Sequence, residues 1–245
     1  MIFYVGLHQP SDARRFPEAM ISVKRLTGRR GSFTPPSSSW MLDSGAFTEL
    51  DQHGRYREPP ERYAQRIVRW WHVGRMVSAT SQDYMCEARI LDKTGLSLAD
   101  HQRLTIARYD AIRALVPASI YVLPVLQGYQ PQEYVACLRD YGARLTPGMW
   151  VGVGSVCKRN GTPHAIAAVL RAIKAERPDL RLHGFGCKQT ALGSADVREL
   201  LHSADSLAWS LRARKARYHD GDLSRDANSW REAAAYRARV IEGPP

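Results

Sequence analysis

The side chains best suited to chemistry recur at one kind of place in this sequence, the end of a short apolar run. Residues 40–47 (WMLDSGAF) show the pattern most clearly, because the run stops at Asp43 and a turn-permissive Gly45 follows. In an alternative interpretation, Asp43 only caps the helix expected to begin near residue 48 or 49. The pattern favours a shared design because it recurs at residues 81–83, 125–128, 152–155, 183–186 and 204–206.

These segments would supply carboxylates and an amide to one site. Asp43 and Asp205 suit a reaction in which one carboxylate attacks or stabilises an electrophilic sugar carbon and the other handles a proton. Displacement of a base from C1′ of a nucleotide is such a reaction. Asp83 and Gln127, with the backbone of Gly154, suit recognition of a purine edge through paired donors and acceptors.

In a parallel α/β fold, the carboxyl ends of all strands meet at one mouth, so the segments above would build a single site. We expect Asp43 and Asp205 to be the catalytic residues of this site. The other rim positions are expected to bind the substrate, namely Ser44, Gly45, Asp83, Gln127, Gly128, Gly154, Ser155 and Gly186.

Basic residues follow two of these segments. Lys158 and Arg159 come after residues 152–155, and Arg212 and Arg214 come after residues 204–206. The chain has 35 Lys and Arg against 24 Asp and Glu, and its formal charge of +11 attracts polyanions. We therefore predict that these four cations bind a nucleic-acid backbone. In the alternative, they form a solvated surface and the net charge serves solubility.

Several other kinds of site have no support in the sequence. No two of the four cysteines have CxxC or CxxH spacing, so no metal site is expected. The glycines of residues 151–155 lack the GxGxxG spacing of dinucleotide-binding loops, and no cofactor is predicted. No run approaches about 18 apolar residues, so no membrane span is expected. Residues 2–7 lack the pattern of a signal peptide, and we expect a cytoplasmic protein with reduced thiols.

Eight apolar runs are expected to form the strands that position these residues: 2–7, 20–23, 40–43, 76–81, 120–126, 149–153, 180–185 and 205–210. Helical patterns lie between or after them at residues 59–71, 101–115, 131–141, 163–177, 192–201 and about 226–241. This alternation predicts parallel βα units, and eight of them permit a (β/α)₈ TIM barrel in one domain, residues 1–245. Run 20–23 has the weakest strand pattern, which leaves an open sheet as the alternative. Pro124 predicts a bulge or break near Gln127.

Four of the segments resemble those of tRNA-guanine transglycosylases, and in the same order. Residues 43–47 (DSGAF) are similar to their DSGGF segment and residues 125–128 (VLQG) to their VQG. Residues 151–154 (VGVG) are similar to their glycine-rich substrate strand, and residues 183–186 (HGFG) to their MGVG. Residues 40–47, 151–159 and 204–210 resemble still more closely the short DpdA-like branch, which is associated with deazapurine modification of DNA in phages and mobile elements.

The resemblance implies a TIM barrel that exchanges guanine for a 7-deazaguanine through a covalent glycosyl–enzyme intermediate. Position by position, Asp43 is similar to the acid/base aspartate of the transglycosylases. Asp83, Gln127 and the backbone at Gly154 are similar to their base-recognition groups. The expected partners are a 7-deazaguanine base and a nucleic acid, with DNA favoured over tRNA.

The sequence departs from the transglycosylase pattern in two places. The cysteine cluster of their zinc subdomain is missing, which disfavours a tRNA anticodon as substrate. Their nucleophile lies in a DxFDC-like segment, and alignment with residues 205–209 (DSLAW) places Ala208 at its position. Our leading hypothesis makes Asp205 the nucleophile and Asp43 the general acid/base, and an exchange of these roles stays open.

Two further classes of function use the same residues. In a nucleobase or nucleoside hydrolase, water rather than a deazapurine would capture the intermediate. In a catalytically inactive barrel, the chain would only bind nucleic acid, and Ala208 is the residue that favours this hypothesis.

Overall fold

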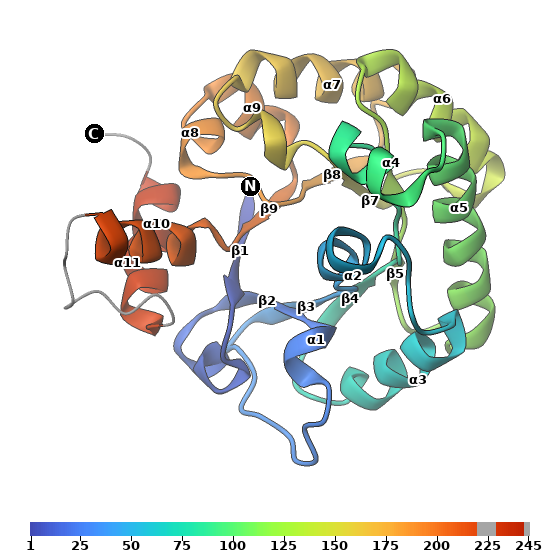
Figure 1. Cartoon of the computed structure of the whole chain (residues 1–245). Coiled ribbons are helices and arrows are strands. Elements are labelled where there is room, and N and C mark those ends of the chain that lie inside the picture. The colour runs from blue at the N-terminus through green and yellow to red at the C-terminus, as the bar shows by residue number, and fades with distance from the viewer. Residues whose placement is uncertain (220–228, 243–245) are drawn as a thin grey trace.

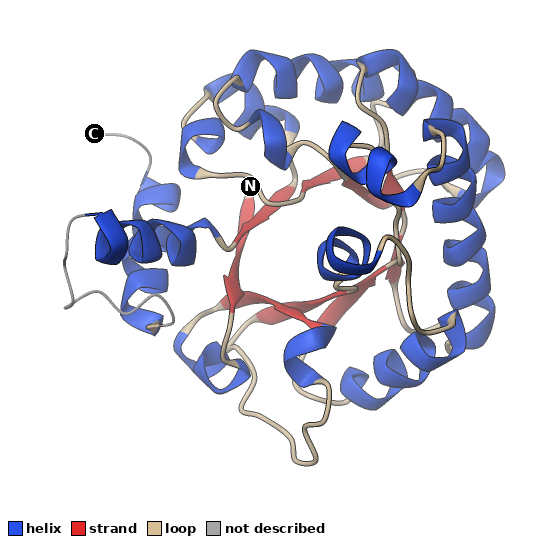
Figure 2. Cartoon of the chain, in the orientation of Figure 1, coloured by secondary structure: helices blue, strands red, loops and turns tan. Residues whose placement is uncertain are grey.

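The chain folds into a ring of parallel strands surrounded by helices (Figure 1, Figure 2). The structure is a computed structural model, and it describes residues 1–219 and 229–242 except for the side chains of residues 212, 215–217 and 219. The predicted (β/α)₈ barrel is confirmed. The weakly predicted second strand pairs with the strands on both sides of it, so the alternative of an open sheet is wrong.

All strands belong to one sheet with the order β5-β4-β3-β2-β1-β9-β8-β7-β6, and every pairing is parallel. Because the strands run in one direction, their carboxyl ends meet at a single mouth. Their bounds are β1 Ile2–Leu7, β2 Glu18–Ser22, β3 Ser39–Asp43, β4 Met76–Thr80, β5 Val122–Leu123, β6 Val125–Leu126, β7 Trp150–Val153, β8 Arg181–Gly184 and β9 Ser203–Ser206.

Pro124 divides the fifth barrel strand into β5 and β6. β5 pairs only with β4, and β6 pairs only with β7, so the two ends of the hydrogen-bonded sheet are joined covalently through Pro124. Proline has no N–H to donate to a neighbouring strand, which explains the division. The predicted break therefore occurs, but at Pro124 itself rather than near Gln127.

The last strand was predicted wrongly. The sequence suggested residues 205–210, whereas β9 spans Ser203–Ser206 and a helix begins at Ala208. The apolar residues after Asp205 resemble a strand, but Ser206 Oγ accepts the N–H of Ala208 and so helps to start the helix. Trp209 is buried and donates its indole N–H to the carbonyl of Gly6 at 2.8 Å, which holds this helix against β1.

The helices form the outer layer, and most lie where the sequence predicted them. The predicted helix 192–201 is two short helices, α8 and α9, and residues 226–228 of the predicted C-terminal helix lie outside the described residues. The helix bounds are α1 Val23–Leu26, α2 Ala46–His53, α3 Pro60–Trp71, α4 Ala88–Thr94, α5 Leu98–Leu115, α6 Pro131–Tyr141, α7 Pro163–Glu176, α8 Gln189–Leu192, α9 Ala195–Leu200, α10 Ala208–His219 and α11 Trp230–Glu242. Three 3₁₀ turns complete the layer, η1 Pro10–Arg15, η2 Gly142–Arg144 and η3 Cys157–Arg159.

Only a short 3₁₀ turn separates the first two strands of the barrel. The C-terminal helix therefore packs against the outside of β1. Between β1 and β2 the chain forms only η1, and α11 packs against β1 with Ala233, Tyr236 and Val240 buried (Figure 1). The barrel interior is filled by large side chains from five strands, Tyr4, Met20, Met41, Leu123 and Trp150. Because this layer plugs the ring, access to a site in the barrel is from the mouth.

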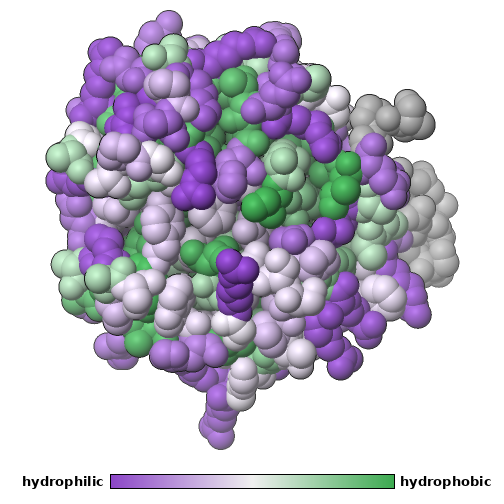
Figure 3. All heavy atoms as spheres, turned by 180° about the vertical axis from the view of Figure 1, so that it is seen from behind, coloured by the Kyte–Doolittle hydropathy of each residue, from purple (hydrophilic) through white to green (hydrophobic). Residues whose placement is uncertain are grey.

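Helix α2 lies over the mouth, inside the ring of strands in the view of Figure 1. It begins directly after β3, and the chain turns at Gly45, which has the left-handed φ of 74°. A Cβ at Gly45 would lie 2.8 Å from Cγ of Lys24, so both conformation and space require glycine there. The face behind the view of Figure 1, at the other end of the barrel, carries hydrophilic residues spread around small apolar patches (Figure 3).

Candidate active site

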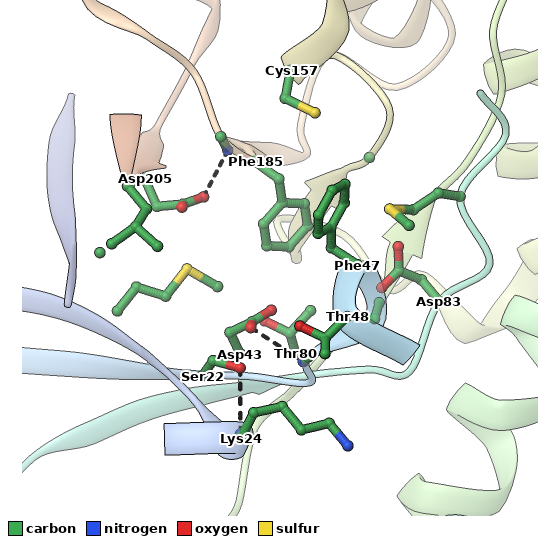
Figure 4. Close-up of a pocket in the computed structure, with 18 of the residues that line it drawn as sticks. Ser22, Lys24, Asp43, Phe47, Thr48, Thr80, Asp83, Cys157, Phe185 and Asp205 are labelled. Carbon is green, nitrogen blue, oxygen red and sulfur yellow. Dashed lines mark hydrogen bonds between the residues drawn. The ribbon is translucent and has the colours of Figure 1, made fainter. Parts of the chain in front are cut away.

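A pocket of about 590 Å³ lies at the carboxyl ends of the strands, beneath α2 (Figure 4). The structure brings eight of the ten predicted rim residues to its wall, namely Asp43, Gly45, Asp83, Gln127, Gly154, Ser155, Gly186 and Asp205. The other two do not line it: Ser44 is buried next to Asp43, and Gly128 packs against the first turn of α6.

Asp205 lies in β9 with its carboxylate at the pocket, and its side chain is 14% exposed. One oxygen, Oδ1, accepts the backbone N–H of Gly186 at 3.0 Å (Figure 4). The same oxygen accepts a hydrogen bond from Nε2 of His183 at 3.3 Å. Both donors hold the same oxygen, so the carboxylate has a fixed orientation and Oδ2 is left for a reacting atom. By contrast, Ala208 does not line the pocket.

Asp43 ends β3 and lines the pocket between Asp205 and Asp83 (Figure 4). Burial and the nearby charge of Asp205 raise the pKa of Asp43 to about 6, against hydrogen bonds from Ser22 and the backbone N–H of Gly45. A carboxyl group with this pKa exchanges protons readily near neutral pH, as a general acid and base must. Asp43 also makes a local turn, since its Oδ2 accepts the N–H of Gly45 at 3.1 Å. The helix that follows begins at Ala46 rather than near residue 48 or 49, and no side chain caps it.

Asp83 and Gln127 form the opposite end of the pocket, where both side chains are buried. Gln127 Nε2 donates to Asp83 Oδ2, and Ser155 Oγ donates to Gln127 Oε1 at 2.8 Å while it accepts the N–H of Cys86. These bonds fix which way the Gln127 amide faces. Burial, together with the charge of Asp43, raises the pKa of Asp83 to about 7 despite the hydrogen bond from Gln127.

Gly154 and Ser155 shape the wall beside this pair. A Cβ at Gly154 would lie 2.1 Å from Gln127 Nε2, so only glycine leaves room for the Gln127 side chain. Both backbone groups of Gly154 are hydrogen-bonded. Its N–H donates to the carbonyl of Leu126, and its carbonyl accepts from the Tyr134 hydroxyl. Ser155 has a φ of 57°, rare for a residue other than glycine, and such strain is often found at functional sites.

Comparison with known protein families identifies the family of this chain. The family model for DpdA, DeoxyPurine in DNA protein A, matches residues 1–244. The chain belongs to the DpdA family. Membership gives this barrel an enzymatic role in deazapurine modification of DNA. No curated protein matches the chain.

The DpdA pocket also contains residues to which the sequence analysis gave no role. Phe47 of α2 and Phe185, which follows β8, both project into it (Figure 4). Phe47 is 50% exposed, so one part of its ring is open to solvent. Phe47 lies in residues 43–47 and Phe185 in residues 183–186, two of the segments that resemble those of the transglycosylases. This resemblance was the sequence feature that could have indicated a role for both rings. Near Asp205 the wall is apolar and consists of Leu7, Met20 and Leu207.

Cations flank the mouth of the DpdA barrel. Lys158 is exposed with Nζ 5.3 Å from the Phe47 ring, and the Arg159 guanidinium lies 4.2 Å from the ring of Tyr129, which is 41% exposed. Arg214 is exposed on α10. Arg212 lies in the same helix, and its side chain is outside the described part of the structure. Two further cations, Lys24 and Arg25, line the pocket itself.

Residues 1–219 and 229–242, the part of the chain that the structure describes, contain neither a cluster of metal ligands nor a membrane-spanning helix. No three His, Cys, Asp or Glu side chains there are grouped so that they could hold a metal ion. Across the same residues, no helix has both the length and the apolar character that crossing a membrane requires.

Proposed function

We propose that this DpdA protein is a DNA guanine transglycosylase that exchanges guanine for a 7-deazaguanine through a covalent bond between C1′ and Asp205. The observation that carries the proposal is the orientation of Asp205. Two donors hold its Oδ1, and Oδ2 is left for the sugar in a pocket that Asp43 also lines. Asp83 and Gln127 at the other end supply the groups that guanine recognition needs.

In the first half-reaction, Asp205 Oδ2 attacks C1′ and the bond between C1′ and N9 of guanine breaks. The electrons of that bond leave with the base, which takes a proton from the carboxylic acid of Asp43. The charge of Asp205 contributes to the raised pKa of Asp43 and so favours the protonated form before attack. Ester formation removes that charge, which lowers the pKa of Asp43 and favours its carboxylate afterwards.

In the second half-reaction, N9 of the incoming 7-deazaguanine attacks C1′, and the Asp205 carboxylate leaves with its electron pair. Asp43 accepts the proton of the base and returns to its starting state. One glycosidic bond is broken and one is formed, so the exchange balances without a cofactor, an oxidant or an energy source.

The base-binding end is complementary to guanine. Guanine presents donors at N1 and N2 and an acceptor at O6. An ionised carboxylate has lone pairs for more than one donor, so Asp83 can accept from the base as well as from Gln127. The second N–H of the Gln127 amide can donate to O6. Phe47 and Phe185 would contact the faces of the ring, since aromatic side chains stack on bases of any sequence.

Substitution of Asp83 by alanine should reduce base discrimination while the barrel stays folded. Adenine lacks the N1 and N2 donors, so the loss of a charged acceptor should reduce the preference for 7-deazaguanine over 7-deazaadenine by about 10- to 100-fold. The measurement is competition between the two free bases for incorporation into DNA. Asp110→Ala is a matched control, because it makes the same change at an exposed carboxylate that pairs with Arg144 and does not line the pocket. Unchanged selectivity in Asp83→Ala would exclude base recognition by Asp83.

The cations beside the mouth should bind phosphates on both sides of a nucleotide whose base has left the helix. Affinity for non-cognate DNA should fall steeply with salt. Each alanine substitution at Lys158, Arg159, Arg212 or Arg214 that removes a phosphate contact should reduce the slope of log affinity against log salt by about 0.7 to 0.9. Base selectivity should be kept, because phosphate contacts carry no sequence information.

The control for this salt titration is Arg139→Ala, which changes the net charge equally on the outer ring, where Arg139 pairs with Glu176. A quadruple variant at the four mouth cations that kept the affinity and salt slope of the wild type would show an ordinary solvated surface instead.

Nucleoside mass spectrometry tests the proposed function and its substrate. DNA and RNA would be isolated after expression of the chain in cells supplied with a 7-deazaguanine, beside cells that express Asp205→Asn. We expect a deazaguanine deoxynucleoside in DNA with the wild type only. Modification confined to RNA, or equal modification with the variant, would contradict the proposal.

A further inference from the structure

His183 is a buried residue that contacts the proposed nucleophile. It lies in β8 and is 0% exposed, with aromatic rings around it: the ring centroids of Phe185, Trp150 and Tyr4 lie 4.7, 5.9 and 6.2 Å away. Both ring nitrogens are hydrogen-bonded. Nε2 lies 3.3 Å from Asp205 Oδ1, and Nδ1 lies 2.9 Å from Ser203 Oγ.

The chain of hydrogen bonds continues from Ser203 to Trp150. Ser203 is itself fully buried, and its Oγ lies 2.9 Å from the indole Nε1 of Trp150. An indole nitrogen can only donate, so Ser203 Oγ must accept this bond. The serine hydroxyl hydrogen is then available for Nδ1 of His183, which is the other polar atom within reach in the described structure.

Only one protonation state of His183 satisfies every bond in this chain. If Nδ1 accepts from Ser203, the ring proton is on Nε2 and is donated to Asp205. The other neutral tautomer would direct the Nε2 lone pair at a carboxylate oxygen. A doubly protonated ring would leave the buried Ser203 hydroxyl hydrogen without an acceptor, at the cost of an unmade buried hydrogen bond.

We propose that Trp150, Ser203 and His183 form a positioning relay that fixes the Nε2–H tautomer of His183 and thereby orients Asp205 for attack. This inference rests on the proposed role of Asp205. Both His183 Nε2–H and the Gly186 N–H donate to Oδ1 of Asp205. Rotation of the carboxylate would therefore break two hydrogen bonds. A neutral donor holds the oxygen without cancelling the negative charge that the nucleophile needs. The same N–H stabilises the carboxylate when it leaves C1′ in the second half-reaction.

The competing explanation is that His183 only fills the barrel interior among its aromatic neighbours. Three variants separate packing from hydrogen bonding. His183→Phe keeps a ring but has no donor, and His183→Gln restores an N–H donor. Trp150→Phe removes the first donor of the chain and keeps an aromatic ring. His202→Gln is the matched control, because the His202 ring also packs on Trp150, with centroids 5.9 Å apart, but no contact joins it to Asp205.

The first measurement is the rate at which labelled free guanine enters a single-stranded oligonucleotide, a reaction that any base exchange must catalyse by microscopic reversibility. A misplaced nucleophile costs on the order of 10²-fold, so we expect that loss in His183→Phe with unchanged DNA affinity. His183→Gln should recover most of the rate, Trp150→Phe should fall between the two, and His202→Gln should match the wild type. Wild-type rates in both His183→Phe and Trp150→Phe, or no recovery in a folded His183→Gln, would overturn the relay.

The second measurement is independent of activity. Nitrogen NMR of protein labelled at histidine should show the Nε2–H tautomer for His183 in the wild type and a changed tautomer ratio in Trp150→Phe. An Nδ1–H or doubly protonated ring in the wild type would overturn the relay. The wild type could show the expected tautomer and yet exchange no guanine. That result would contradict the proposed function, but the directions of the hydrogen bonds from Trp150 to Asp205 would stand.

Discussion

Substitution of Asp205 by asparagine is expected to abolish the covalent enzyme–DNA adduct and, with it, base exchange. An amide oxygen is a far poorer nucleophile than a carboxylate, and loss of a nucleophile typically lowers turnover by more than about 10³-fold. Asparagine has nearly the shape of aspartate and can still accept the N–H groups of Gly186 and His183. The fold and DNA affinity should therefore be unchanged. Intact-protein mass spectrometry after denaturation would measure the adduct.

The control for this substitution is Asp196→Asn, the same chemical change at an exposed carboxylate that pairs with Arg171 on the outer ring. It should form adduct as the wild type does. Adduct formation at the wild-type rate in Asp205→Asn would remove Asp205 from the nucleophile role. Asp43, which lines the same pocket, would then be the candidate nucleophile, and the roles of the two residues would be exchanged.

Substitution of Asp43 by asparagine is expected to slow both half-reactions, by about 10²- to 10⁴-fold, the usual contribution of a general acid or base. The two half-reactions should also depend on pH in opposite directions. Asp43 must be protonated to release guanine, and its pKa is about 6, so adduct formation in a single turnover should decrease as the pH rises above that value. Capture of the incoming base needs the carboxylate and should decrease as the pH falls.

In Asp43→Asn, adduct formation should no longer decrease at high pH, and capture of the base should no longer decrease at low pH. The reason is that an amide does not titrate in this range. Rapid-quench measurement of each half-reaction between pH 5 and 8 would test this, since that range brackets the pKa expected of a catalytic group tuned to neutral pH. An unchanged pH dependence in the variant would assign the proton transfer to a different group.

The sequence predicted much of the barrel because each strand is a short apolar run that ends in a characteristic polar or glycine-containing segment. These ends also predicted the pocket, since parallel strands bring them to one mouth whatever the details of packing. The errors have local causes. Residues 205–210 are apolar enough for a strand, but the Ser206 side chain begins a helix there, and Pro124 rather than Gln127 marks the division of the fifth strand.

Other features depend on contacts between distant residues and leave no local pattern. The position of α2 over the mouth, which brings Phe47 into the pocket, follows from the turn at Gly45 against Lys24. The hydrogen-bond chain from Trp150 to Asp205 joins residues that are 53 and 20 positions apart at its first two bonds. Alternation along a strand shows that these residues face inward, but it does not show which of them meet.

The most direct test of the account follows labelled guanine in DNA that is incubated with the protein, with and without a free 7-deazaguanine base. Without the deazapurine, base exchange predicts release of at most one guanine per protein molecule, because the covalent adduct then waits for an incoming base. With the deazapurine, release should continue, in step with the deazaguanine that enters the DNA, and Asp205→Asn should release none. Continued release in the absence of added base would show a hydrolase. Binding of DNA with no release under either condition would show an inactive barrel, and either result would contradict the proposed exchange.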